Sequence, residues 1–326
     1  MTDEPDQEAG ARPPRETLTL VGHEAAEAEL AGTLSGARLH HAWLISGPKG
    51  VGKATLAYRF ARRLLGAAQS GPRPLDAAAD DPVVRRIAAG SHPDLRVLRR
   101  ALNDRGDRYK RDISAEDARA IAEFFSMKSS VGGWRVTIVD AVDDLNRHAA
   151  NAILKTLEEP PPRAILLLIC HTPGAALATI RSRCRRLALR PLRDEQVEAA
   201  AGAPLDEAAL RLAAGRPGRA IALQASGAAA FAGSLDDALD RAKKTGPAGL
   251  LSLAFDRAGP AAPARLDIVL EAGQAWLRRR ALADPADRYA AAWRDLDDLR
   301  GQSEGLGLDP GHSLVRAMQI LYHAAA

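Results

Sequence analysis

The sequence predicts an α/β domain, a doubly wound parallel sheet of five strands, followed by an all-α half. Apolar runs of strand length alternate with helical patterns as far as residue 190, which is typical of a parallel sheet covered by helices. The first run, residues 41–46, passes through a glycine-rich turn into a helical pattern at 54–65, the usual opening unit of such a sheet. From residue 191 onward no strand pattern occurs, and alanine, the strongest helix former, becomes abundant.

The other elements of the α/β domain follow from apolar runs and helix-start signals. Ser114 with Asp117 is close to a capping box, and Asn146 can cap a helix that Pro160 stops. Further strands are expected at 94–98, 134–139, 164–170 and 184–189. The helices between them are expected at 82–89, 115–126, 146–159 and 174–179.

Shifts in composition predict the organisation of the whole chain. Glycine and proline at 215–218 and 246–248 are expected to separate helices in the second half. The first three helices of that half are expected at 193–201, 205–214 and 218–227. The expected segments are a disordered leader at 1–13, the α/β domain at 14–190, a small helical unit at 191–230 and a larger one at 231–326.

The composition excludes several classes of protein. Charged residues at 26% and apolar residues at 46% are ordinary for a globular protein, and the formal charge of +4 permits nucleic-acid contact without demanding it. The chain has two cysteines, Cys170 and Cys184, which are too few for a disulfide scaffold or a four-cysteine zinc site. They are expected to be packing residues, and their small number fits a reducing cytoplasm. No run of about 18 apolar residues occurs, and the polar start lacks the apolar segment of a signal peptide.

A glycine-rich segment after the first strand has the spacing of a phosphate-binding loop, G-x-x-x-x-G-K. Gly47, Gly50 and Gly52 let backbone N–H groups turn toward phosphate oxygens, and Lys53 reaches the outer phosphates. The helix that follows adds the positive end of its dipole. The segment therefore predicts a site for ATP or ADP; the alternative is a glycine-rich turn without a ligand.

Two departures from the motif weaken metal binding and hydrolysis. The residue after the lysine is normally Ser or Thr, whose hydroxyl holds Mg²⁺, but here it is Ala54; Thr55 is turned about 100° away along the helix. Asp140 ends a strand where such proteins place a carboxylate beside Mg²⁺, and Ala141 stands where the base that activates water is expected. We therefore expect the site to position Mg²⁺ only weakly, and we expect this chain to have lost ATP hydrolysis.

Three segments together resemble the bacterial clamp-loader family. They are HHAWLISGPKGVGKATLA at 40–57, NAILKTLEEPP at 151–161 and LATIRSRC at 177–184, and the resemblance extends over about 21–230. This AAA+ family comprises the gamma/tau and delta-prime subunits of DNA polymerase III and is related to replication factor C. The pattern of Ala54, Ala141 and a retained Arg183 is similar to the delta-prime branch rather than to the active gamma/tau ATPases.

The resemblance implies an AAA+ fold with a helical lid and a helical collar, and a set of cytoplasmic partners. It implies a hetero-pentamer with gamma/tau and delta subunits that places a sliding clamp on primed DNA as part of a DNA polymerase holoenzyme. Many relatives carry a zinc-binding cysteine cluster; residues 56–139 contain no cysteine, so no zinc is expected.

The resemblance also assigns roles to individual residues. It makes Arg183 an arginine finger that acts on ATP held by a neighbouring gamma/tau subunit. It makes Arg219 a sensor-2 arginine, and it places His171 and Thr172 at the end of the fourth strand, where a polar sensor-1 residue belongs. Each residue also has an alternative role that needs no ligand. Arg183 could belong to a solvated basic edge, Arg219 could be an ordinary arginine at a helix start, and residues 171–172 could cap the strand.

Two other functions stay open at this point. One is an active gamma/tau-like ATPase that uses Thr55 and an unconventional base such as Asp143. The other is a stand-alone DNA-binding protein, for which the basic segment 96–112 is the candidate surface, although a solvated hairpin is the simpler interpretation. Trp276 and Trp293 are expected in the helical core.

Overall fold

The structure is a computed structural model that describes residues 7–34, 39–103, 105–106, 109–130, 133–174, 176–255, 262–306 and 308–326. The chain forms two compact units. The first comprises Met1–Ala203 with Gly215–Arg219, and the second comprises Pro204–Ala214 with Ala220–Ala326. The three-part division at residues 190 and 230 stays a prediction.

The first unit is built on a five-stranded, all-parallel sheet in the order β2-β3-β4-β1-β5. Its strands are β1 (Ala42–Ser46), β2 (Leu95–Leu98), β3 (Arg135–Val139), β4 (Ala164–Cys170) and β5 (Arg185–Ala188). This confirms the predicted fold class. The central strand β4 is apolar throughout and fully buried, because both faces of the sheet are covered.

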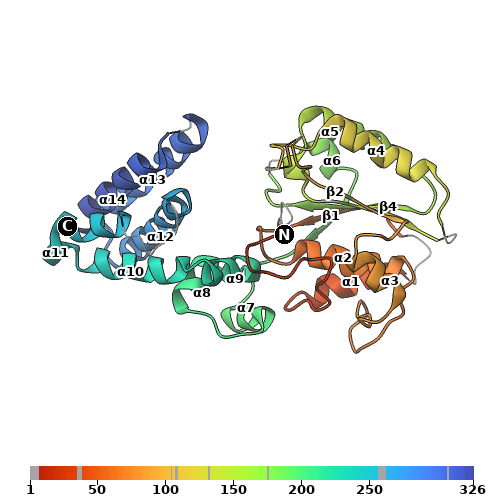
Figure 1. Cartoon of the computed structure of the whole chain (residues 1–326), viewed down its shortest axis with the longest axis horizontal. Helices are drawn as coiled ribbons and strands as arrows, with labels where there is room; N and C mark the ends of the chain where they lie inside the picture. The colour runs from red at the N-terminus through yellow and green to blue at the C-terminus, as the bar shows by residue number, and fades with distance from the viewer. Residues whose placement is uncertain are drawn as a thin grey trace. The chain divides into compact units, whose positions relative to one another are not determined.

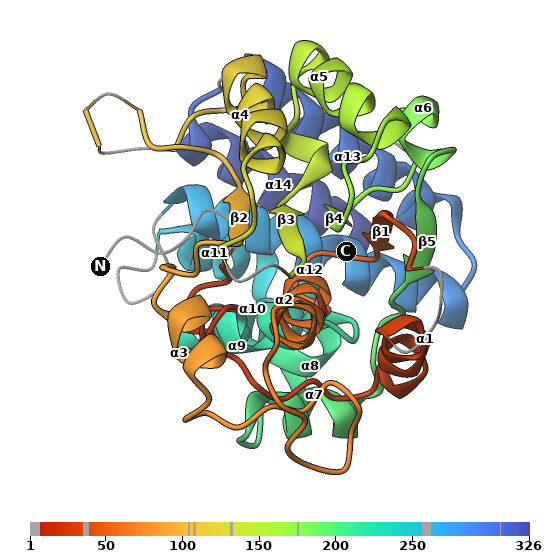
Figure 2. The same ribbon diagram turned by 90° about the vertical axis from the view of Figure 1, so that its right-hand side faces the viewer.

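Helices cover the sheet on both faces (Figures 1 and 2). One face carries α1 (Glu24–Leu34), α2 (Lys53–Leu64) and α3 (Pro82–Ala88), and the other carries α4 (Ala115–Ser126), α5 (Arg147–Glu158) and α6 (Ala178–Arg181). Successive strand side chains alternate between the two cores. In β4, Ile165, Leu167 and Ile169 pack on the first core, while Leu166, Leu168 and Cys170 pack on the second.

Local capping agrees with the sequence. The Ser114 hydroxyl accepts from the Asp117 N–H at 3.2 Å, and the Asp117 carboxylate accepts from the Ser114 N–H at 3.1 Å, so aspartate completes the capping box. Asn146 accepts from the Ala149 N–H at 2.9 Å and begins α5. These caps fix the ends of the helices that flank β3.

The second half of the chain is helical. Its elements are α7 (Asp194–Ala201), α8 (Glu207–Ala213), α9 (Pro217–Ala225), α10 (Ala228–Asp240), α11 (Ala242–Ala254), α12 (Ala262–Ala283), α13 (Asp287–Leu306) and α14 (Pro310–Ala325). Trp276 is buried as predicted, but the prediction for Trp293 was wrong, because that side chain is 37% exposed. The buried stripe of α13 runs through Ala292 and Leu296, and Trp293 lies about 100° round the helix from Ala292.

Several local predictions differ from the structure. The helix α1 was not predicted: its Ala and Glu residues favour a helix, but its apolar stripe is weak, and it buries only Ala26, Glu27 and Leu30. The helix expected at 174–179 is α6, which begins at Ala178, and residue 175 lies outside the described residues. The break expected at 246–248 is a kink at Gly246 within α11.

The two remaining segments are described in part. Residues 1–6 of the expected leader lie outside the described residues, and residues 7–13 contain neither helix nor strand. In the basic segment, Leu102 pairs with Tyr109 in an antiparallel bridge, and the Lys110 N–H donates to Ala101 O at 2.8 Å, as in a hairpin. Arg108 of that segment also lies outside the described part of the chain.

Candidate functional site

The candidate nucleotide site is the loop between β1 and α2. Its first glycine, Gly47, donates its N–H to Cys170 O at 3.2 Å. Its φ is +149°, and a Cβ there would lie 2.5 Å from Leu189 O. No side chain fits at this position, so the glycine is required for the loop to leave the sheet between β4 and the end of β5.

The middle of the loop rests on the start of α9. Gly50 O accepts from the Gly218 N–H at 2.9 Å, and a Cβ at Gly50 would lie 3.0 Å from the Arg219 backbone nitrogen. Gly50 has φ +81°, which favours glycine, and Gly52 is the left-handed N-cap of α2. The structure therefore brings the predicted sensor-2 residue Arg219 to the phosphate loop within the first unit.

A buried histidine supports the loop from the other side. The His23 ring lies with Nε2 3.0 Å from Val51 O, and the residue is buried. Burial lowers the pKa of His23, so the neutral ring donates from Nε2 to this carbonyl. Sequence reasoning missed His23, because no spacing rule connects it with a loop that lies 28 residues further along the chain.

The motif lysine is buried against its own loop. Lys53 Nζ donates to Gly47 O at 2.6 Å and to Pro48 O at 2.7 Å, and the residue is 3% exposed. Burial lowers the pKa of Lys53 to about 8, although Asp140 and Asp143 favour the charged form. With the glycine loop and the helix start, this amine fits the phosphates of a nucleotide.

This buried lysine predicts a pH dependence of nucleotide binding. Bound phosphates favour the ammonium form, so nucleotide affinity is expected to be flat below pH 8. It then falls about tenfold per pH unit above pH 8, because binding takes up a proton there. Titration with a fluorescent ADP analogue at several pH values measures this. Lys53→Met, which lacks the titrating group, should bind weakly with no such slope; a flat profile for the unmodified chain would contradict the assignment.

The groups around the loop do not fit Mg²⁺. A P-loop site holds the ion through a hydroxyl after the lysine and a carboxylate after the strand. Ala54 offers a methyl group, while Thr55 is the next residue of α2, and Asp140 supplies the carboxylate at the end of β3. Within the described ranges no group of three or more His, Cys, Asp or Glu side chains is placed to hold a metal.

The carboxylate of Asp143 is engaged by the end of β4. It follows β3 in a short 3-10 helix, η1 (Val142–Asp144), and accepts from the His171 N–H and from the Thr172 N–H, each at 2.7 Å. Each oxygen accepts one backbone hydrogen bond, and the two bonds anchor η1 to the end of β4. Asp143 is thus a structural carboxylate and poorly suited to act as a base.

Of the two residues that follow β4, His171 is the less exposed and is affected by the charge of Lys53. Burial and the positive charge of Lys53 lower the pKa of His171 to about 4, so its ring is neutral. Both of its ring nitrogens are buried and lack a hydrogen-bond partner within the described part of the chain. Thr172 is exposed, and its role as the sensor-1 residue stays a prediction.

The predicted finger residue lies two residues beyond α6 and contacts the last residue of α5. Arg183 Nη2 lies 2.7 Å from Glu158 Oε1, and Nη1 donates to Thr179 O at 3.0 Å and to Ser182 Oγ at 3.3 Å. Its side chain is 35% exposed. The neighbouring Arg185 instead pairs with Glu29, at 2.9 Å. Arg183 and Arg185 therefore pair with different carboxylates.

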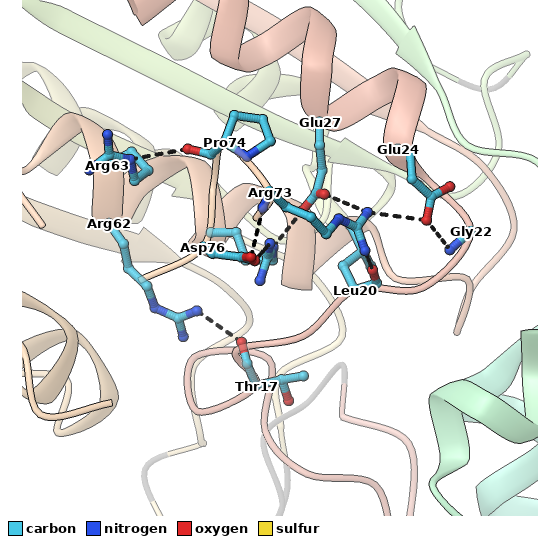
Figure 3. A network of polar contacts seen from close by, with 11 residues as sticks. Thr17, Leu20, Gly22, Glu24, Glu27, Arg62, Arg63, Arg73, Pro74 and Asp76 are labelled. Atoms are coloured by element: carbon cyan, nitrogen blue, oxygen red, sulfur yellow. Dashed lines mark hydrogen bonds and ion pairs between the residues drawn. The ribbon is translucent and has the colours of Figure 1, made fainter. Parts of the chain in front are cut away.

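A buried network of charges sets the position of α2, which carries Lys53 (Figure 3). Arg59 Nε lies 2.6 Å from Glu27, and its Nη2 lies 2.7 Å from Asp76. Arg73 Nη2 lies 2.5 Å from Glu27, and Arg62 donates to Thr17 O at 2.9 Å. The network thus ties α2 to α1, to the segment before it and to the loop after it.

The parallel sheet, the phosphate loop after β1 and the helical second half together form an AAA+ fold. A gamma subunit-related DNA polymerase III protein of Thermotoga maritima shares the fold. It matches 92% of this chain and 99% of its own with a TM-score of 0.52 and 17% identity. The model of the family described as DNA polymerase III, delta subunit, matches residues 22–193, and the chain belongs to that family.

Curated relatives carry names from the same polymerase. The DNA polymerase III subunit delta′ of Pseudomonas aeruginosa is 36% identical over 44% of this chain and 41% of its own length. The delta′ subunit of Escherichia coli is 34% identical over 60% of this chain and 58% of its own, and the tau subunit of that organism is 35% identical over 56% and 27%. The chain thus spans less than two thirds of the length of these relatives. None of the described helices is both long and apolar enough to cross a membrane.

Proposed function

We propose that this chain is a delta-prime-like, non-hydrolysing subunit of a DNA polymerase III clamp loader. The observation that carries the proposal is that the chain keeps a phosphate loop and the predicted finger arginine but lacks the groups that hydrolyse ATP. The phosphate loop keeps Lys53, but Ala54 and Ala141 replace the groups for metal and water, and Asp143 is engaged by backbone N–H groups. Arg183, in contrast, is partly exposed and is held by Glu158 at the end of α5.

In this proposal the chain offers Arg183 to ATP bound by a neighbouring gamma/tau subunit. A guanidinium is always charged and stabilises the charge that develops on the transferred phosphoryl group. The chain's own loop binds ATP or ADP through Gly47, Gly50, Gly52 and Lys53 without turning it over. Residues 231–326 act as the collar that joins it to gamma/tau and delta subunits, and residues 191–230 act as the lid. The assembly opens a sliding clamp and places it on primed DNA in the cytoplasm.

Reconstitution tests the proposal. The chain alone should show no ATP turnover with or without DNA and clamp, because two groups that hydrolysis needs are missing. Added to gamma/tau, delta, clamp and primed DNA, it should strongly stimulate ATP hydrolysis and clamp loading. Turnover by the chain alone that rises with DNA and clamp would instead favour the active gamma/tau-like ATPase, and no stimulation of the mixture would reject the clamp-loader role.

A further inference from the structure

We propose that Glu158 is a positioning residue for Arg183, which it orients toward the ATP of the neighbouring subunit. The inference rests on the proposed function. It begins from the contact of 2.7 Å between Glu158 Oε1 and Arg183 Nη2. Glu158 is the last residue of α5, and Arg183 lies two residues beyond α6. The contact therefore connects the end of one helix with the residue that the proposal makes the finger.

The geometry leaves part of the guanidinium available. The contacts with Thr179 O and Ser182 Oγ engage Nη1, and the contact with Glu158 engages Nη2. A guanidinium has five N–H donors, so the Nε–H and the second Nη2–H are left for phosphate oxygens. The three acceptors hold the side chain in one orientation without covering all of its donors.

Pre-orientation of this kind favours the transition state. A free arginine side chain samples many rotamers, and this rotamer entropy is lost when it engages a phosphate. Glu158 is held in place as the last residue of α5, and Pro160 prevents the helix from continuing. Its contact with Arg183 therefore removes part of that rotamer freedom before the phosphate binds. The pair is partly exposed, at 35% for Arg183 and 51% for Glu158, so the expected effect is modest.

The chain supplies a matched control beside Glu158. Glu159 is the next residue, has the same side chain and is exposed. Its carboxylate forms no ion pair within the part of the chain that the structure describes. Glu158→Ala and Glu159→Ala thus remove the same charge from the same helix end, and only the first removes the contact with Arg183.

The test is steady-state ATP hydrolysis by the reconstituted loader with clamp and primed DNA. Glu158→Ala is expected to lower the kcat that this chain adds by about two- to fivefold, the rate equivalent of an exposed ion pair. KM for ATP should not change, because an interaction made in the transition state affects kcat. Glu159→Ala should match the unmodified chain, and circular dichroism with thermal unfolding checks that all variants fold.

A double-mutant cycle separates positioning from a structural role. With Arg183→Ala already present, Glu158→Ala should cause no further loss. An equal loss in both backgrounds, a loss with Glu159→Ala, or a rise in rate with Glu158→Ala would overturn the inference. If Arg183→Ala itself has no effect, the finger assignment of the proposed function fails. If it has a large effect while Glu158→Ala has none, only the positioning role fails.

Discussion

Arg183→Ala is expected to abolish most of the ATP hydrolysis that this chain stimulates in a reconstituted loader. An arginine finger contributes about 10³-fold or more to the rate at the site it faces, because it neutralises charge that exists only in the transition state. Alanine removes all five donors together with the charge. Clamp loading on primed DNA and phosphate release at saturating ATP measure the effect.

The specificity of this effect is checked at a neighbouring arginine. Arg185→Ala removes the same charge from the same edge but breaks a contact with Glu29 instead of Glu158. It should leave ATP hydrolysis close to that of the unmodified assembly. If Arg183→Ala still assembles with the partners and stimulates hydrolysis as fully as the unmodified chain, the subunit acts only as structure and the finger assignment is wrong.

Glu27→Ala is expected to destabilise the first unit by about 3–5 kcal/mol, the cost of breaking a buried ion pair from one side. Glu27 contacts Arg59 at 2.6 Å and Arg73 at 2.5 Å, and its side chain is 1% exposed. Without it, Arg59 keeps Asp76 as a partner but its Nε stays buried without an acceptor. Urea unfolding, monitored by hydrogen exchange in peptides from β1 and α2, measures the loss of stability.

Glu24→Ala is the matched control for this loss. Glu24 lies on the same helix and also pairs with Arg73, at 3.3 Å, but its side chain is 66% exposed. Its removal should change the stability by at most about 1 kcal/mol, because water screens the pair. Equal, small losses for both variants would show that the Glu27 network contributes little to holding α2 and the phosphate loop.

The sequence predicts the sheet and the phosphate loop because their signals are local. Each strand is a short apolar run, and the residues of the loop from Gly47 to Lys53 are contiguous. The sequence signal for a helix is weaker where the helix lacks a strong apolar stripe. The helix α1 was missed for this reason, and Trp293 was assigned to a core although it lies beside the buried stripe of α13.

By itself, the sequence determined the identity of the groups at the site: which phosphate-binding residues are present, and that Ala54 and Ala141 stand where a hydroxyl and a carboxylate are expected. Only the tertiary structure decided which partners those groups meet. In the folded chain, Asp143 accepts hydrogen bonds from two N–H groups at the end of β4, and Val51 O accepts one from His23. Arg183 forms an ion pair with Glu158. These contacts depend on how the elements pack, and side-chain spacing along the chain does not encode that packing.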